Sequence, residues 1–267
     1  MKKLIFVDSD GTLKNNEGVI SEKTKIILGK LKDKEIEVII TTGRPRYHAL
    51  KVKNNSNASR YVISSNGAEV YDSLTGETIY ASYIKKEHVL DIFNIAKKNN
   101  SKCIMTVDDK EVVTDLVKND SQVMLNEDLN TYLDNNLVKQ LYIKSSNEID
   151  ARRMYRDIKD YGKVKIANES SYFYTGVVED KGIWFTITNI QVNKGNAIKK
   201  LSKHLNVDLS NTYGFGNDYN DIKMFETVNY SIVMENANED LKKRAKLIAK
   251  SNDKDGVADF LEETFLK

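Results

Sequence analysis

Short apolar runs alternate with stretches of helical periodicity over the first part of the chain. The run at residues 4–7 has no polar member, which is typical of a strand covered on both faces in a parallel sheet. Apolar residues at helical spacing follow Ser21, a candidate N-cap residue, and a second apolar run occupies residues 36–40. This order predicts a β-α-β unit whose first strand, residues 3–7, ends at carboxylates.

The pattern changes twice further along the chain. A third strand at residues 61–64 leads into an Asn-Gly turn and a hairpin across 69–71 and 78–83. From about residue 83, strands and helices alternate without carboxylates at the strand ends, and near residues 184–187 the chain returns to the first pattern. The elements expected in the middle are helices at 87–97 and 149–161 and strands at 102–107, 137–145, 164–167 and 172–177. Those expected afterwards are helices at 194–205, 218–225 and 257–265 and strands at 212–215 and 231–234.

These elements predict an α/β fold of two parts. Residues 1–82 and 188–267 would form a discontinuous, Rossmann-like core around a parallel sheet, and residues 83–187 an inserted α+β module. A chain of 267 residues is long enough for this arrangement, because single cores rarely grow much past about 250 residues.

Composition narrows the possible partners. The 41 basic and 39 acidic residues leave a net charge of +2, too small to attract nucleic acid or an anionic membrane. No stretch approaches the roughly 20 apolar residues of a membrane span. The single cysteine, Cys103, cannot form an intramolecular disulfide. We therefore expect a cytoplasmic protein, a monomer or weak homodimer, that binds a small molecule.

The first candidate site is Asp8-Ser9-Asp10-Gly11-Thr12, directly after the first strand, where open α/β sheets bind their ligands. Two carboxylates one residue apart can divide the work of phosphoryl transfer. One attacks phosphorus while the other exchanges a proton with the leaving oxygen. The alternative interpretation is a polar turn that ends a buried strand.

Two further candidates follow apolar segments or begin a helix. Thr42-Gly43-Arg44 follows the second strand, and its hydroxyl and backbone N–H groups could hold phosphate oxygens. Lys194 begins an amphipathic helix and could neutralise a carboxylate and a phosphoryl group. A simple turn and a surface lysine are the respective alternatives.

The fourth candidate is the oxygen-rich segment at residues 214–221, after another predicted strand. It contains Asn217, Asp218, Asn220 and Asp221, whose oxygens suit a hard cation such as Mg²⁺. Alone it could be an Asn/Asp-rich turn that caps the next helix. A parallel sheet would bring all these strand ends into one cleft, which favours the functional interpretation.

Taken together, the motifs resemble the haloacid dehalogenase superfamily and, within it, the Cof-type phosphatases with a C2-type cap. The resemblance extends over essentially the whole chain. The motifs that carry it are Asp8-x-Asp10-Gly11-Thr12, Thr42-Gly43-Arg44, Ser65-Asn66-Gly67-Ala68, Lys194-Gly195, Gly216-x-x-x-Asn220-Asp221 with Met224, Asn236-Ala237 and Ser251-Asn252-Asp253-x-Asp255-Gly256-Val257.

The resemblance implies a role for each matching residue. Asp8 would be the nucleophile that forms an aspartyl-phosphate, and Asp10 the acid/base that also gives its backbone carbonyl to Mg²⁺. Thr42 and Lys194 would hold the phosphoryl oxygens, and Asp221 would orient the water shell of the metal. Further contributions to phosphate binding are expected from Ser9, Gly43, Arg44 and Asn220. The inserted module would be the cap that closes over the cleft and recognises the leaving group.

One residue departs from the family pattern. Where the family has Gly-Asp, this chain has Gly216-Asn217, followed by Asp218. Asn217 is the preferred metal ligand, because amide oxygens can bind Mg²⁺, although the lost charge would weaken binding. Asp218 is the other candidate.

The expected function is Mg²⁺-dependent hydrolysis of a small phosphorylated metabolite, a sugar phosphate in the leading hypothesis. A phosphotransferase or phosphomutase would pass the phosphoryl group to a second hydroxyl instead of water. A phosphometabolite-binding regulatory module, weakened in turnover by Asn217, is the remaining alternative.

Overall fold

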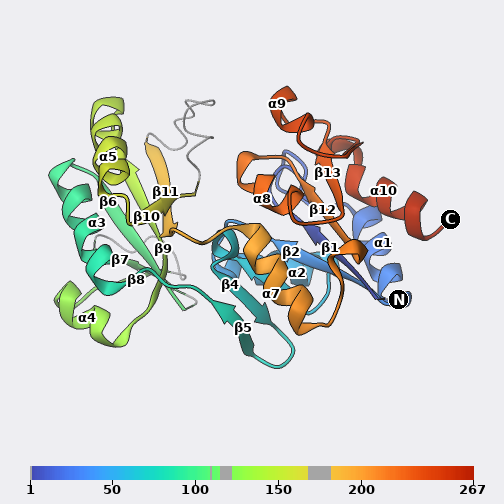
Figure 1. Ribbon diagram of the computed structural model, residues 1–267, viewed down its shortest axis with the longest axis horizontal. Coiled ribbons are helices and arrows are strands. Elements are labelled where there is room, and N and C mark those ends of the chain that lie inside the picture. Colours follow the sequence, from blue (N-terminus) through green and yellow to red (C-terminus); the bar gives the residue numbers. More distant parts are fainter. Residues whose placement is uncertain (1, 109, 115–121, 168–181) are drawn as a thin grey trace. The chain divides into compact units, whose positions relative to one another are not determined.

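The computed structural model describes residues 2–108, 110–114, 122–167 and 182–267, and the chain forms two compact units (Figure 1). Unit 1 comprises Met1–Tyr80 and Asn193–Lys267, and unit 2 comprises Ala81–Val192. The chain returns to unit 1 later than residue 188, where the sequence places the boundary. The reason is that strand β11 (Ile183–Asn189) pairs with strand β9 (Val138–Ser145) inside unit 2.

Unit 1 is built on an eight-stranded sheet with β1 (Lys3–Val7) near its middle. The order across the sheet is β14 (Leu247–Ala249), β13 (Tyr230–Met234), β12 (Thr212–Gly216), β1, β2 (Ile36–Thr41), β3 (Tyr61–Ser64), β4 (Glu69–Asp72) and β5 (Glu77–Ala81). Strands β14 through β3 are parallel, and β4 runs antiparallel to β3. The carboxyl ends of six strands therefore lie at one edge.

Helices cover both faces of this sheet, which explains why its strands have so few polar positions. Ile5 and Val7 pack in one apolar cluster with α1 (Glu22–Lys32), α2 (Arg46–Ser56) and α10 (Gly256–Phe265). Leu4 and Phe6 pack in the opposite cluster with α7 (Lys194–His204), α8 (Ile222–Phe225) and α9 (Glu239–Lys242). Because successive side chains of a strand point to opposite faces of the sheet, the residues of β1 contribute alternately to two apolar cores.

Capping residues fix where the helices of unit 1 begin. The side chain of Ser21 accepts from Thr24 N at the start of α1, as expected from its position in the sequence. The predicted helix at 218–225 is instead a short 3₁₀ turn, η3 (Tyr219–Asp221), followed by α8, because Asp218 and Asp221 form a capping box over a single turn.

Unit 2 has a six-stranded, mostly antiparallel sheet, and its described residues form one apolar cluster. The sheet order is β10 (Val164–Ile166), β11, β9, β6 (Lys102–Val107), β7 (Lys110–Val113) and β8 (Gln122–Met124). Helices α3 (Lys86–Lys98), α4 (Leu129–Asn135) and α5 (Glu148–Tyr161) contribute to the cluster. Met105, Leu141 and Ile187 are aligned in register and face this cluster.

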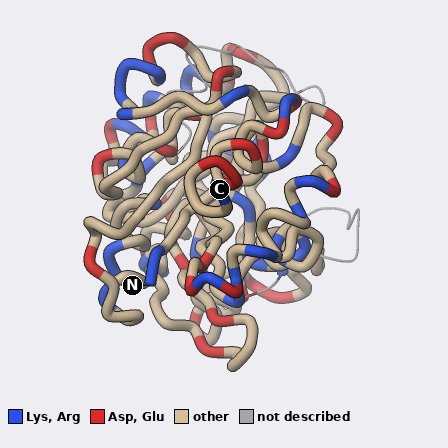
Figure 2. The backbone as a smooth tube through the Cα atoms, turned by 90° about the vertical axis from the view of Figure 1, so that its right-hand side faces the viewer, with Lys and Arg blue, Asp and Glu red and all other residues tan. Residues whose placement is uncertain are grey.

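The predicted elements agree with the structure where they are long or strongly apolar. The short elements β7, β8, α4, α9 and β14 were not predicted, and the strand expected at 172–177 lies outside the described residues. Within the described ranges, no helix is both long enough and apolar enough to cross a membrane. Figure 2 shows Lys and Arg interspersed with Asp and Glu along the backbone, as the small net charge implies.

Candidate active site

The candidate site lies where the strand order of unit 1 changes direction. Strand β1 is flanked by β2 on one side and β12 on the other, although β12 comes much later in the chain. Such a switch point opens a crevice at the carboxyl ends of the strands. Asp8 follows β1 directly, and its N–H donates to Phe215 O at 2.9 Å, which extends the pairing with β12.

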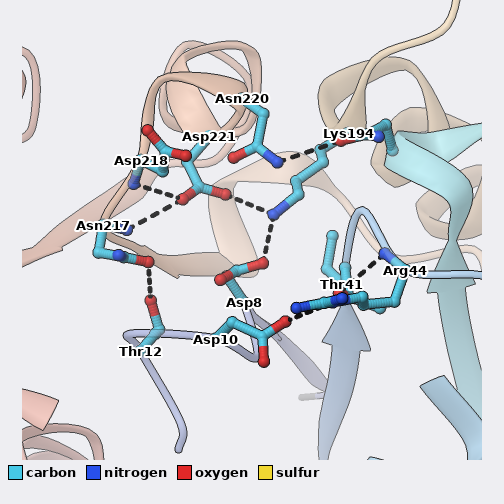
Figure 3. Close-up of polar contacts among 12 residues, drawn as sticks. Asp8, Asp10, Thr12, Thr41, Arg44, Lys194, Asn217, Asp218, Asn220 and Asp221 are labelled. Carbon is cyan, nitrogen blue, oxygen red and sulfur yellow. Dashed lines mark hydrogen bonds and ion pairs between the residues drawn. The ribbon is translucent and has the colours of Figure 1, made fainter. Parts of the chain in front are cut away.

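Lys194 joins two carboxylates at the centre of the site (Figure 3). Its Nζ lies 2.6 Å from Asp8 Oδ1 and 2.6 Å from Asp221 Oδ1. All three residues are buried. Lys194 is the first residue of α7, and Gly195 allows this helix to approach α8 closely, because a Cβ there would lie 2.2 Å from Lys223 O.

Burial and charge shift the acidity of this cluster. Burial raises the pKa of Asp8 to about 7, with a further increase from Asp221 and an opposing effect from Lys194. Burial acts to lower the pKa of Lys194, but Asp221 and Asp8 outweigh it and hold that pKa above its usual value. The lysine therefore stays charged, and Asp8 lies close to its ionisation point near neutral pH.

Asp221 also fixes the loop after β12. Its Oδ2 accepts from the backbone N–H groups of Asn217 and Asp218 at 2.9 and 3.0 Å. A Cβ at Gly216 would lie 2.4 Å from Asp221 Cγ, so only glycine fits where the strand ends. The carboxylate of Asp221 thus orients Lys194 with one oxygen and this loop with the other.

Asp10 is more open to solvent than Asp8. Its Oδ2 accepts from Arg44 Nε at 3.1 Å, and Lys14 Nζ lies 3.3 Å from Oδ1. Burial acts to raise the pKa of Asp10, but Arg44 and Lys14 outweigh it and lower that pKa below the usual aspartate value. The two carboxylates of the Asp8 motif therefore have opposite pKa shifts, which in the metal-free protein favour the protonated form of Asp8 and the ionised form of Asp10.

The predicted phosphate-binding residues lie on the neighbouring loops. Thr42 is buried, and its Oγ1 accepts from Arg44 N at 3.2 Å. The loop at Gly43 meets Asn66, whose Oδ1 accepts from Asn220 Nδ2 at 3.1 Å. Ser9 is fully buried, and its Oγ has no hydrogen-bond partner among the described residues.

The two candidates for the metal ligand after β12, Asn217 and Asp218, make different contacts. The Asn217 side chain lies against the Asp8 motif, where its Oδ1 accepts from Thr12 Oγ1 at 2.8 Å. The Asp218 carboxylate caps η3 and accepts from Tyr219 N at 2.7 Å. Asn217 thus lies on the Asp8 side of the loop, and the Asp218 carboxylate is held within it.

These donors fit a magnesium ion. In the described part of the chain, no group of three or more His, Cys, Asp and Glu residues could hold a metal ion. The expected set is different, because it combines the Asp8 carboxylate with the Asp10 carbonyl and the Asn217 amide. All are hard oxygen donors, and Mg²⁺ needs only one or two carboxylates because it retains several waters.

Unit 1 therefore contains every residue to which the sequence analysis assigned a role, on loops at the carboxyl ends of β1, β2 and β12 and at the start of α7. Two participants were not predicted, namely Lys14 beside Asp10 and Asn66 beside Asn220. Asn66 belongs to a recognised motif, which was a usable signal. Lys14 follows Asp10 by four residues, but lysine is too common in this chain for that spacing to stand out.

Comparisons with known proteins identify the family. A family model described as haloacid dehalogenase-like hydrolase matches residues 5–261. The chain belongs to this family, which confirms both the family and the fold predicted from the motifs.

Named relatives align with nearly the full length of the chain. Phosphatase YwpJ of Bacillus subtilis is 26% identical and covers 97% of this chain and 99% of its own. The 5-amino-6-(5-phospho-D-ribitylamino)uracil phosphatase YcsE of the same organism is 24% identical, with 96% and 93% covered. A solved sugar phosphatase of haloacid dehalogenase subclass IIB superposes with a TM-score of 0.77 at 23% identity, with 98% of each chain covered. The predicted class of enzyme, a phosphatase of this family, agrees with these names.

Proposed function

We propose that the protein is a Mg²⁺-dependent phosphatase that hydrolyses a small phosphorylated metabolite, with sugar phosphates as the substrate class. The observation that carries the proposal is the buried Lys194, which lies 2.6 Å from both Asp8 and Asp221 at the switch point of the sheet. An ammonium group held there neutralises a carboxylate that approaches an anionic phosphate.

The reaction proceeds in two in-line steps. An Asp8 carboxylate oxygen attacks phosphorus and forms an acyl-phosphate bond while the bond to the leaving oxygen breaks, and Asp10 gives its proton to that oxygen. Asp10 then accepts a proton from water as the water oxygen attacks the same phosphorus. The acyl-phosphate bond breaks, which releases inorganic phosphate and regenerates Asp8.

Magnesium would be held by the Asp8 carboxylate, the Asp10 carbonyl and Asn217. When bound, it would offset the charge repulsion between the nucleophile and the phosphate. Asp221 would orient the water shell of the metal, and the position of Asn217 against Thr12 favours it over Asp218 as ligand.

The phosphoryl oxygens would be bound by groups from three loops. Thr42 and Lys194 are the principal ones, both buried, and Ser9, between the two carboxylates of the Asp8 motif, is a further contributor. The remaining contributors are Gly43, Arg44 and Asn220.

The names of the relatives support the substrate class. One acts on a sugar phosphate and another on a phosphate carried by a ribityl chain, so both substrates are hydroxylated alkyl phosphates. Unit 2 would act as the cap that recognises this hydroxylated part. The cytoplasmic location and the monomeric or weakly dimeric state remain predictions.

Phosphate release from p-nitrophenyl phosphate and from a panel of sugar phosphates, with and without Mg²⁺, tests the proposal. We expect turnover that requires the metal and falls by about four orders of magnitude or more in Asp8→Asn, because the nucleophile is removed. Asn229→Asp, directly before β13 and bonded to residues at the amino end of β12, serves as the control and should retain full activity.

Other outcomes would assign a different function. Movement of labelled phosphoryl groups between sugar positions with little free phosphate would indicate a mutase. Tight binding of sugar phosphates without turnover would indicate a binding module. Turnover that persists in Asp8→Asn would contradict the mechanism.

A further inference from the structure

Two asparagines near the C-terminus hold the loop that follows Asp10. Asn236 Nδ2 donates to Gly11 O at 2.9 Å, and Asn252 Nδ2 donates to Lys14 O at 2.9 Å. More than 200 residues separate donor from acceptor in each case. Backbone carbonyls on either side of Thr12 are thus fixed by side chains from outside the loop.

The two asparagines also bind each other. Asn252 N donates to Asn236 Oδ1 at 3.1 Å, and Asn252 Nδ2 makes a second contact of 3.2 Å with Asn16 Oδ1. Asn16 N in turn donates to Asp253 Oδ1 at 2.9 Å. We refer to Asn236, Asn252 and Asp253 as the asparagine clamp. Asn252 is its buried member, with 5% of its surface exposed.

A tight turn aims Asn252 at the loop. Asp255 has a left-handed backbone with φ of 52°, and a Cβ on the next residue, Gly256, would lie 1.9 Å from Lys250 O. Gly256 N donates to Ser251 O at 3.2 Å, which closes the turn before α10 begins. The glycine is required for this close approach, and the turn places Asn252 against the loop at Lys14 and Asn16.

The loop needs such support because packing does not fix Asp10. The Asp10 side chain is 46% exposed, and its ion-pair partner Arg44 is 58% exposed. Exposed ion pairs contribute little to orientation in solution. The direction of the carboxylate therefore depends on the backbone from Gly11 to Lys14. Within the loop, Leu13 N and Lys14 N donate to Ser9 O, and the clamp holds the carbonyls of Gly11 and Lys14 from outside.

We infer that Asn252, together with Asn236, is a positioning residue that keeps Asp10 directed at the leaving oxygen. The inference rests on the proposed function, since it assumes that Asp10 is the general acid. The motifs around Asn236 and Asn252 have no role in the proposed phosphate or metal binding, and the inference gives them one.

Asn252→Asp tests the inference with little change in shape. It replaces the Nδ2 donor by an acceptor that faces Lys14 O and Asn16 Oδ1, so the loop loses its anchor. The test compares kcat/KM on ribose 5-phosphate with kcat/KM on 2,4-dinitrophenyl phosphate. Both values report the steps up to departure of the leaving group, but dinitrophenolate leaves without a proton.

We expect Asn252→Asp to lower kcat/KM on ribose 5-phosphate by about tenfold and on the dinitrophenyl ester by less than about threefold. KM should change little. Asn236→Asp, at an exposed position, should show the same asymmetry and provides a second variant should Asn252→Asp fold poorly. Asn229→Asp, which loses a comparable bond to Ser210 O, is the matched control and should change neither value.

Equal losses on both substrates would overturn the inference, because they would reveal a general structural role. An unchanged kcat/KM in both clamp variants would overturn it as well. Wild-type protein that turns over neither substrate would instead refute the proposed function. Hydrogen exchange of the peptide that contains residues 8–16 gives an independent readout, and it should be faster in Asn252→Asp than in Asn229→Asp.

Discussion

The two units bury polar side chains of different kinds. All four buried carboxylates among the described residues belong to unit 1, and each is paired with a cation. Unit 2 buries no carboxylate among the described residues. It buries one lysine, Lys139, whose Nζ donates to Asp108 O at 3.3 Å, and a row of neutral groups, Thr106, Gln140 and Thr188, aligned in register on the sheet face opposite its apolar cluster. Buried carboxylates paired with cations suit phosphoryl chemistry, whereas hydroxyl and amide groups suit a hydroxylated ligand. The comparison supports the proposal that unit 1 carries out the reaction and unit 2 recognises the substrate.

Removal of the central cation should have the largest effect on unit 1. Lys194→Met leaves Asp8 and Asp221 buried without a counter-ion, so we expect a loss of about 3–5 kcal/mol in the free energy of unfolding. Urea denaturation measures this change. Lys223→Met removes an exposed lysine near Glu226 and should cost less than about 1 kcal/mol. Equal losses in the free energy of unfolding for the two substitutions would contradict the claim that the buried lysine stabilises unit 1 more than a surface lysine does.

The pKa of Asp8 predicts how the stability of the metal-free protein depends on pH. The folded state holds this proton up to about pH 7, whereas an aspartate in the unfolded chain loses it at about pH 3.9. The folded state therefore binds more protons between these values. Its free energy of unfolding should fall as pH rises through this window and level off above about pH 7.

Asp8→Asn abolishes this titration and serves as the reference. Between about pH 5 and about pH 8, wild-type protein should lose on the order of 1–3 kcal/mol relative to the variant in urea denaturation. If the free energy of unfolding depended on pH in the same way in both proteins, the pKa of Asp8 would not be raised in the folded state.

Asn217→Asp sharpens the assignment of the metal ligand. The substitution adds a charge beside the Asp8 motif, so the Mg²⁺ dissociation constant measured by calorimetry should fall by about tenfold. Asp218→Asn is the matched control, and we expect its dissociation constant to stay within about twofold. The reverse order of effects would assign the ligand to Asp218.

The smallest effect is expected in unit 2. The hydroxyls of Thr106 and Thr188 are buried and have no hydrogen-bond partner among the described residues. Thr106→Val keeps the side-chain volume but removes one hydroxyl, so the ratio of kcat/KM for two sugar phosphates should change by about threefold or more. Turnover of p-nitrophenyl phosphate should not change. Thr114→Val, at an exposed position, is the control.

Much of unit 1 was predictable because its sequence repeats one physical signal. Each of β1, β2 and β12 is an apolar strand followed at once by polar residues, and parallel strands bring those ends together. The order of the motifs then identified Asp8, Asp10 and Lys194. Short elements such as β14 and α9 were missed because three or four residues contain no recognisable period.

Contacts between side chains were harder to predict. Lys194 contacts Asp8 and Asp221 at the same time only because α7 packs closely on α8. A single sequence does not specify how closely two helices pack. The pairing of Asp10 with Lys14 involves partly exposed groups with no hydrophobic pattern. The clamp at Asn252 depends on a left-handed residue, Asp255, and periodicity gives no sign of it.

The central claim is that Asp8 itself becomes phosphorylated. The most direct test is to quench turnover of a sugar phosphate in acid, reduce the acyl phosphate with borohydride and locate the modified residue by mass spectrometry. We predict reduction of Asp8 to homoserine in wild-type protein and none in Asp8→Asn. Steady turnover with an unmodified Asp8, or modification at another carboxylate, would contradict the account.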